Sequence, residues 1–132
     1  MIVLDANILV AAAIGRQVPR VLAEAYARGV TLAVAEEQII EAASVLIEKI
    51  GLAEPEAREA LERITALVNP LAPEFFAAME TPARQRLHQR AQSDWPVLAA
   101  ALASGGGIWT NDRDFFGIGV PVWSSRNMVY AT

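Results

Sequence analysis

The stretch GIWTNDRDF, residues 107–115, passes from a short apolar segment directly into a polar turn that carries two carboxylates. Continuous apolar character is typical of a parallel strand covered by helices on both faces. In open α/β sheets, ligands bind at the carboxyl ends of such strands. Thr, Asn and Asp are also ordinary turn and capping residues. Taken alone, the stretch therefore favours a plain turn, and the rest of the chain must decide.

Length and composition indicate one globular domain over residues 1–132. Of the 132 residues, 54% are hydrophobic, and mean hydropathy is +0.30, which excludes a disordered chain. No apolar run approaches the roughly 20 residues of a membrane helix, and no basic leader precedes the apolar start at Ile2. The absence of cysteine removes disulfides, thiolate ligands and thiol nucleophiles. We expect a cytoplasmic protein without a membrane partner.

The charge of the chain gives a weak indication about its partners. The net charge of −4 argues against an indiscriminate nucleic-acid binder, because such proteins usually carry a basic surface. Lys49 is the only lysine among 11 basic residues, so nearly all the positive charge comes from arginine. The planar guanidinium of arginine suits phosphate recognition.

Short apolar segments alternate with helical patterns along the chain, which predicts a three-layer α/β/α domain. Its central sheet is expected to be mostly parallel, with four to five short strands. Strands are predicted at residues 2–4, 31–34, 108–109 and 120–123, and a further one near Val68 is left open. Helices are predicted at residues 8–13, 18–28, 36–50, 54–68, 82–90 and 94–103.

The helices at 36–50 and 54–68 have the clearest patterns and are expected to form an antiparallel hairpin. The first helix is expected to end at Gly51 and to turn an apolar stripe inward. The stripe consists of Ile39, Ala43, Leu46 and Ile50, and it is widened by Ile40 and Ile47. This stripe puts Glu41 on the opposite, polar side with Glu37. Periodicity alone therefore makes Glu41 a solvated charge.

Three aspartates occur where strands end or helices begin. Asp5 follows the first strand, Asp112 follows the strand at 108–109, and Asp94 begins the helix that precedes that strand. Each has an ordinary alternative, because Asp caps helices and occupies turns. The alternative is about as probable as function for Asp5 and stronger for Asp94, since Ser93-Asp94-Trp95-Pro96 is a good helix start.

Together the aspartates point to a metal site. A doubly wound sheet brings the ends of its first and fourth strands to one edge, where these carboxylates would repel one another unless a cation joined them or their pKa values rose. Oxygen ligands without cysteine or a candidate histidine favour Mg²⁺ or Mn²⁺. Such a cation can activate water and stabilise charge on a phosphodiester. Phosphodiester hydrolysis is the predicted reaction class.

Four motifs in order resemble the PIN-domain ribonucleases over nearly the whole chain. They are MIVLDANILV at residues 1–10, Glu41 ahead of Val45-Leu46, DWPVLAAA at 94–101 and WTNDRDF at 109–115. No single motif is specific, and the match rests on their order and spacing. The chain looks most similar to the small toxins of the VapC type.

The resemblance implies a Rossmann-like fold and a Mg²⁺- or Mn²⁺-dependent endoribonuclease that acts on single-stranded or looped RNA. It assigns four carboxylates to catalysis and metal binding: Asp5, Glu41, Asp94 and Asp112. It also prefers Glu41 to Glu37 as the glutamate of the site. The resemblance also implies supporting roles beside these carboxylates for Asn7, Thr110 and Asp114.

The resemblance also implies partners. Relatives are commonly homodimers restrained by a small antitoxin protein. The segment at residues 90–93 lacks acids that many relatives carry, which puts a second metal ion in doubt. Four arginines are weak candidates for contacts with the RNA backbone, and a solvated face explains them about as well: Arg84, Arg86, Arg90 and Arg113.

Two other functions compete with this one. A Mg²⁺-dependent phosphatase of the haloacid dehalogenase type could use Asp5 as nucleophile, but it requires a second Asp where Asn7 stands and a lysine near the site, whereas Lys49 lies late in a helix. A PIN-like module without catalytic activity is the other alternative, and the complete carboxylate set argues against it.

Overall fold

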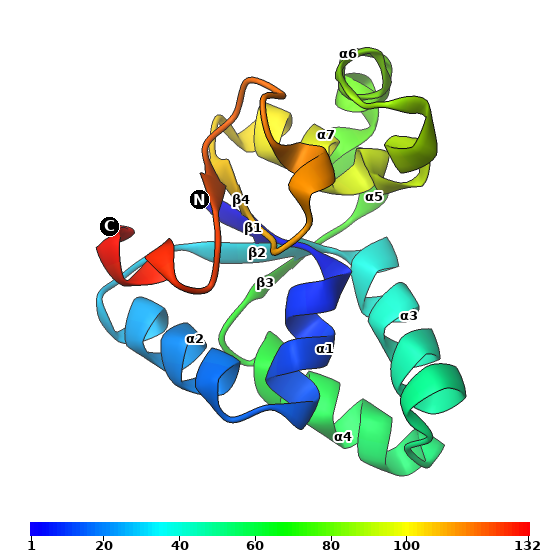
Figure 1. Ribbon diagram of the computed structural model, residues 1–132, viewed down its shortest axis with the longest axis vertical. Helices are drawn as coiled ribbons and strands as arrows, with labels where there is room; N and C mark the ends of the chain where they lie inside the picture. Colours follow the sequence, from blue (N-terminus) through cyan, green and yellow to red (C-terminus); the bar gives the residue numbers. More distant parts are fainter.

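Five parallel strands form one sheet in the order β3–β2–β1–β4–β5 in the computed structural model, which describes residues 1–132 (Figure 1). The strands are short: β1 Ile2–Leu4, β2 Leu32–Ala35, β3 Asn69–Leu71, β4 Gly107–Trp109 and β5 Val122–Trp123. In β1, Ile2 pairs with Leu32 of β2 on one side and with Gly107 of β4 on the other. The order reverses at β1, so β1 and β4 meet at the switch point where α/β sheets bind ligands.

Helices cover both faces of the sheet, so the predicted three-layer α/β/α, PIN-like architecture is confirmed (Figure 1). One layer contains α1 Ala6–Ile14, α2 Gln17–Ala27, α3 Glu36–Val45, which continues as a π-helical turn at Leu46–Ile50, and α4 Glu54–Thr65. The other contains α5 Pro73–Phe76, α6 Glu80–Arg86 and α7 Trp95–Ser104. Short 3-10 turns lie at Ala77–Met79, Gln89–Asp94, Arg113–Phe115 and Asn127–Tyr130. No helix combines the length and apolar character needed to cross a membrane.

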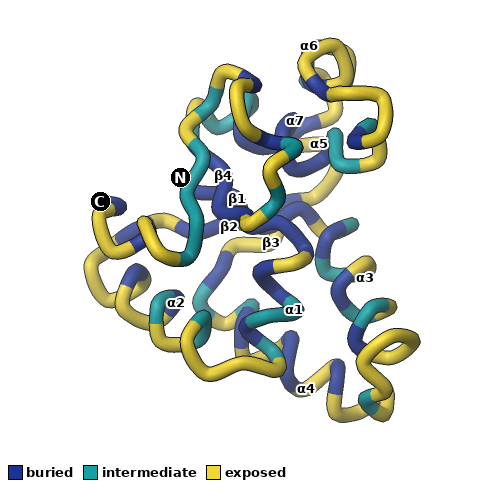
Figure 2. The backbone as a smooth tube through the Cα atoms, viewed as in Figure 1, coloured by how far each residue is buried: buried dark blue, intermediate teal, exposed yellow.

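The strands supply both hydrophobic cores because successive side chains point to opposite faces. Ile2 and Leu4 of β1 pack with α1 to α4, whereas Val3 packs with α5 to α7. In Figure 2 the buried backbone is concentrated in the sheet and in α7. Burial on both faces explains why these strands appear in the sequence as continuous apolar runs.

The strand left open near Val68 is β3 at Asn69–Leu71, a segment in which the sequence shows only a break in the helical pattern. Pro70 lies inside it, and Asn69 and Pro70 are exposed. Proline is tolerated here because β3 is an edge strand, where one side of the backbone needs no hydrogen-bond partner.

The inward face of α3 differs from the predicted stripe. Gln38, Ala42 and Leu46 are buried, whereas Ile40 is 70% exposed and Ile50 is 46% exposed. The buried face packs on α1, and Ile40 lines a groove between the two arms of the predicted α3–α4 hairpin. The inward face of the helix is thus rotated from the predicted stripe to the row formed by Gln38, Ala42 and Leu46.

The basic helix is shorter than predicted. It ends at Arg86, and Leu87 is extended, so Arg90 belongs to a separate 3-10 turn that leads into Asp94. His88, between the two segments, is exposed.

A glycine allows β4 to enter the sheet. A Cβ at Gly106 would collide with the carbonyl oxygen of Met1. The next residue, Gly107, donates its backbone N–H to that same oxygen at 3.1 Å. The close approach places β4 directly beside β1.

Candidate functional site

Asp5 is the centre of the site. It follows β1 and is only 5% exposed. Its Oδ1 accepts from the backbone N–H of Ala6 at 2.7 Å, and its Oδ2 accepts from Thr110 Oγ1 at 2.8 Å and from Asn7 Nδ2 at 3.1 Å. The helix-capping role considered from the sequence is therefore present at one oxygen, while the other oxygen is held by β4.

Thr110 connects Asp5 to the turn after β4. Its hydroxyl donates to Asp5 and accepts from the backbone N–H of Asp112 at 3.0 Å, and Asn7 Nδ2 lies 3.4 Å from it. Thr110 is 1% exposed. A single buried hydroxyl thus orients the carboxylate after β1 and the backbone of the acidic turn after β4.

The two acids of that turn have different surroundings. Asp112 Oδ1 accepts from the backbone N–H of Asp114 at 2.9 Å, a side-chain turn that leaves its Oδ2 without a protein donor. Asp114 forms an ion pair with Arg90, whose Nη2 lies 2.7 Å from its Oδ1. Asp112 is therefore available to a ligand, whereas Asp114 already has a cationic partner.

Asp94 precedes α7 and is half-buried, and its side chain makes no capping hydrogen bond. Helix capping, the stronger alternative in the sequence, therefore does not account for this carboxylate. The charges of Asp5, Glu41 and Asp112 act on it, so it belongs to the same cluster.

The structure distinguishes the two candidate glutamates. Glu41 is exposed on α3, and its charge acts on both Asp5 and Asp94. Glu37 lies one turn earlier, where burial raises its pKa and the charge that acts on it comes from Glu36. Its Oε2 is buried without a hydrogen-bond partner. Glu41 is thus the glutamate that lies with the aspartates, which periodicity alone had not indicated.

Burial, followed by repulsion among the acids, raises the pKa values of two carboxylates in the cluster. Burial is the largest cause of the rise in the pKa of Asp5 from 3.8 to about 6; hydrogen bonds from Thr110 and Ala6 oppose it, and the charges of Glu41 and Asp112 add to it. Burial also raises the pKa of Asp94 to about 6, followed by repulsion from Asp5 and the other acids. Perturbed carboxylates gathered at a sheet edge are typical of functional sites.

The donor set fits a hard divalent cation. Its ligand atoms are carboxylate oxygens, and a positive charge at this edge would relieve the repulsion that raises the pKa of Asp5 and Asp94. No three acidic or histidine side chains converge closely enough to enclose an ion. Mg²⁺ does not need such an enclosure, because it commonly keeps several waters and takes one or two protein carboxylates together with substrate phosphates. The residues therefore suit an open, partly hydrated cation.

Three of the four candidate arginines have intramolecular partners. Arg84 pairs with Glu80 at 2.8 Å and lies over the ring of Trp95. Arg86 donates to the carbonyl of Ile118 at 3.1 Å. Arg90 pairs with Asp114, as described above. Arg113 is exposed and has no such partner, so it is the arginine most available to a ligand.

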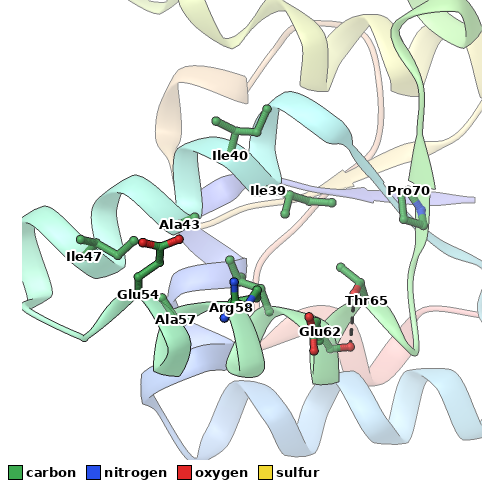
Figure 3. A pocket seen from close by; sticks show the side chains of 11 residues that line it. Ile39, Ile40, Ala43, Ile47, Glu54, Ala57, Arg58, Glu62, Thr65 and Pro70 are labelled. Carbon is green, nitrogen blue, oxygen red and sulfur yellow. Dashed lines mark hydrogen bonds between the residues drawn. The ribbon is translucent and has the colours of Figure 1, made fainter.

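The apolar groove between α3 and α4 lies outside this site. Ile39, Ile40 and Ile47 line it from α3, and Arg58 and Thr65 line it from α4 (Figure 3). None of the site carboxylates contributes to its walls.

Sequence reasoning missed two polar residues near the site. Gln38 is 2% exposed, and its Oε1 accepts from Ala6 N–H at 3.0 Å. Ser125 Oγ accepts from Trp109 Nε1 at 3.1 Å, and its backbone N–H donates to Asn111 Oδ1 at 3.2 Å, which ties the turn after β5 to the turn after β4. The burial of Gln38 could have been predicted only if the orientation of α3 had been known.

Comparison with protein families gives one result. A family model described as PIN domain matches residues 3–132. A search of curated proteins gives no significant match. The matched span contains every residue of the site described above.

Proposed function

The chain belongs to the PIN-domain family, whose members are generally nucleases, and we propose that it is a Mg²⁺- or Mn²⁺-dependent endoribonuclease. The observation that carries the proposal is the position of Asp5. A carboxylate that is 5% exposed stands at the switch point of the sheet, with a pKa of about 6 and no cationic side chain hydrogen-bonded to it. Such a group is costly to the fold, and a bound cation would offset that cost.

The residues of the cluster would divide the work as follows. Asp5, Asp94 and Asp112 would surround a hydrated ion, with one or two of them as direct ligands, and Thr110 and Asn7 orient Asp5 by the hydrogen bonds already described. A divalent cation, when bound, supplies stabilisation of negative charge on the phosphodiester and lowers the pKa of water.

Hydrolysis then needs one proton acceptor. The oxygen of a water molecule forms a bond to phosphorus, the bond from phosphorus to the leaving sugar oxygen breaks, and the proton of the water passes to a carboxylate. We assign that acceptance to Glu41, which is the exposed member of the cluster. The leaving oxygen takes its proton from solvent. Positioned acid–base groups of this kind typically contribute about 10²- to 10⁴-fold in rate.

Cleavage of a single-stranded RNA tests the proposal. The purified protein should cut it with Mg²⁺ or Mn²⁺ and not in excess EDTA, and Asp112→Asn should abolish cutting while the thermal midpoint stays close to wild type. Cutting that persists in excess EDTA would refute the metal mechanism. Failure to cut any RNA, with a thermal midpoint unaffected by either ion, would support the inactive binding module instead. Release of phosphate from a small phosphomonoester, lost in Asp5→Asn, would support the phosphatase.

We further propose a toxin role with RNA, a small antitoxin and a second copy of the chain as partners, in the cytoplasm. The support is the likeness of its motifs to VapC-type toxins. Expression should arrest growth, and coexpression of a short neighbouring reading frame should restore it; growth that continues unimpaired would contradict the toxin role. Light scattering that gives the mass of one chain would contradict the homodimer.

Arg113 is the arginine that we assign to the RNA backbone, because the other three candidates have partners within the protein. Arg113→Ala should weaken RNA binding and reduce its salt dependence, whereas Arg84→Ala should not. The opposite result would return the assignment to α6.

A further inference from the structure

The molecule has three buried polar side chains, and they form one connected group. They are Asp5, Gln38 and Thr110, with exposures of 5%, 2% and 1%. Thr110 donates directly to Asp5. Gln38 reaches Asp5 through the Ala6 amide, which donates both to Asp5 Oδ1 and to Gln38 Oε1. All three of the buried polar residues thus lie around one carboxylate.

Gln38 makes no other side-chain hydrogen bond, so the contact with the Ala6 amide is the one that satisfies its buried oxygen. It approaches from α3, whereas Ala6 begins α1, and the two residues are separated by 32 positions in the chain. The amide of Ala6 lies 2.7 Å from the Asp5 oxygen and 3.0 Å from the Gln38 oxygen. Because the Ala6 amide donates to both side chains, the Asp5 and Gln38 oxygens are both held close to the same backbone nitrogen.

The shared donor also relates Asp5 to Glu41. Gln38 and Glu41 lie three positions apart on α3, so they lie on neighbouring parts of the helix surface. Glu41 is close enough for its charge to act on Asp5. A contact that attaches the first turn of α3 to the start of α1 therefore sets the distance between these two carboxylates.

We propose that Gln38 is a positioning residue of the site. By accepting from the Ala6 amide, which also donates to Asp5, it fixes α3, with Glu41, against the start of α1, so that Asp5 and Glu41 are arranged before a cation or substrate binds. The role rests on the proposed function, because it concerns the same carboxylate site. Partners that hydrogen-bond a metal ligand directly typically contribute about 10- to 100-fold to metal affinity or activity, and we take that range as the upper limit for Gln38, which acts through the Ala6 amide.

The contact can be tested in metal-free protein by NMR. Gln38→Met keeps the size of the side chain and removes the acceptor oxygen, so it should move the Ala6 amide proton and Asp5 carboxyl resonances. Gln38→Glu keeps an acceptor on the same stem and should return the Ala6 resonance toward wild type. Leu46→Met is the matched control, because Leu46 lies on the same buried side of α3 and makes no polar contact. Resonances that move no more in Gln38→Met than in the control would overturn the proposal.

The functional effect is measured by Mn²⁺ titration and by RNA cleavage. Gln38→Met should raise the Kd for Mn²⁺ and lower kcat, each by up to about 10- to 100-fold, with KM for RNA unchanged, while Leu46→Met stays within about twofold of wild type. Equal values for the two variants would overturn the positioning role. Wild-type protein that binds no Mn²⁺ or cuts no RNA would refute the proposed function instead, and the Ala6 resonance would still decide whether Gln38 fixes α3 to the start of α1.

Discussion

Replacing Asp5 with asparagine should stabilise the metal-free protein at neutral pH. The folded protein raises the pKa of this carboxyl from 3.8 to about 6, so ionised Asp5 opposes folding. A rise of this size corresponds to about 3 kcal/mol once the group is fully ionised in both states. Asparagine has no charge to desolvate, but it offers one acceptor where Asp5 has two. Thr110 can reverse its hydrogen bond, whereas the bond from Asn7 is lost, at a cost of about 1 kcal/mol.

The net expectation for Asp5→Asn is a gain of about 2 kcal/mol at pH 7, or about 5–10 °C in thermal midpoint. The sign follows from proton binding: between pH 4 and pH 6 the folded protein holds a proton on Asp5 that the unfolded chain has released. Wild-type stability therefore falls as pH rises through this window, and the variant keeps only the part of that dependence that comes from Asp94, whose pKa burial also raises to about 6. The advantage of the variant should be largest above about pH 6 and should vanish near pH 4.

Urea unfolding from pH 4 to pH 8, with EDTA present, measures this difference. Asp114→Asn is the matched control, because Asp114 has an arginine partner and should show no gain. Added Mg²⁺ should stabilise wild type at pH 7 and leave the variant unchanged, since the ion replaces the missing positive charge. An Asp5→Asn protein that is less stable than wild type at pH 7 by the same amount as at pH 4 would refute the reasoning.

Three further predictions concern neighbouring residues. Thr110→Val should destabilise the protein by about 1–3 kcal/mol in urea, because it removes one of the two donors to the buried Asp5 Oδ2 and leaves the Asp112 amide without its acceptor; Thr110→Ser should restore most of the loss, and equal losses would contradict the hydroxyl's role. Glu41→Gln should reduce RNA cleavage by about 10²-fold or more with stability within about 0.5 kcal/mol of wild type, whereas Glu37→Gln should cut normally; full activity of the Glu41 variant would show that the wrong glutamate was chosen. Arg90→Ala should cost no more than about 1 kcal/mol, because the guanidinium that pairs with Asp114 is largely exposed, and a greater loss in urea would mean that the pair holds the acidic turn in place.

The sequence predicted the sheet where its strands are buried on both faces. β1 and β4 are continuous apolar runs because helices cover them on both sides, and each ends at the polar residue that the switch point presents. β3 lacked this signal, since Asn69 and Pro70 are exposed at the edge of the sheet. An edge strand needs neither apolar residues nor every amide, so its pairing with β2 depends on the tertiary fold.

The site was less predictable from local patterns, because its members are brought together by the packing of α3. Helical periodicity predicts the inward face of a helix from the average hydrophobicity of its residues. In α3 the isoleucines led this average to the wrong face. Ile40 is 70% exposed and Gln38 is 2% exposed, the reverse of what hydrophobicity predicts for the two side chains. Only the resemblance to a family singled out Glu41, and nothing in the sequence singled out Gln38.

The concentration of polar burial around Asp5 has a physical consequence for how this site evolved. A fold that only needed stability would place an apolar residue after β1, because an ionised carboxylate there opposes folding. Thr110, Asn7 and the Ala6 amide instead donate hydrogen bonds to the carboxylate, which hold its direction and only partly offset the cost of burial. The same arrangement that weakens the metal-free protein would let Asp5 bind the proposed cation without reorganisation. Stabilising substitutions at Asp5 and loss of cation binding should therefore occur together.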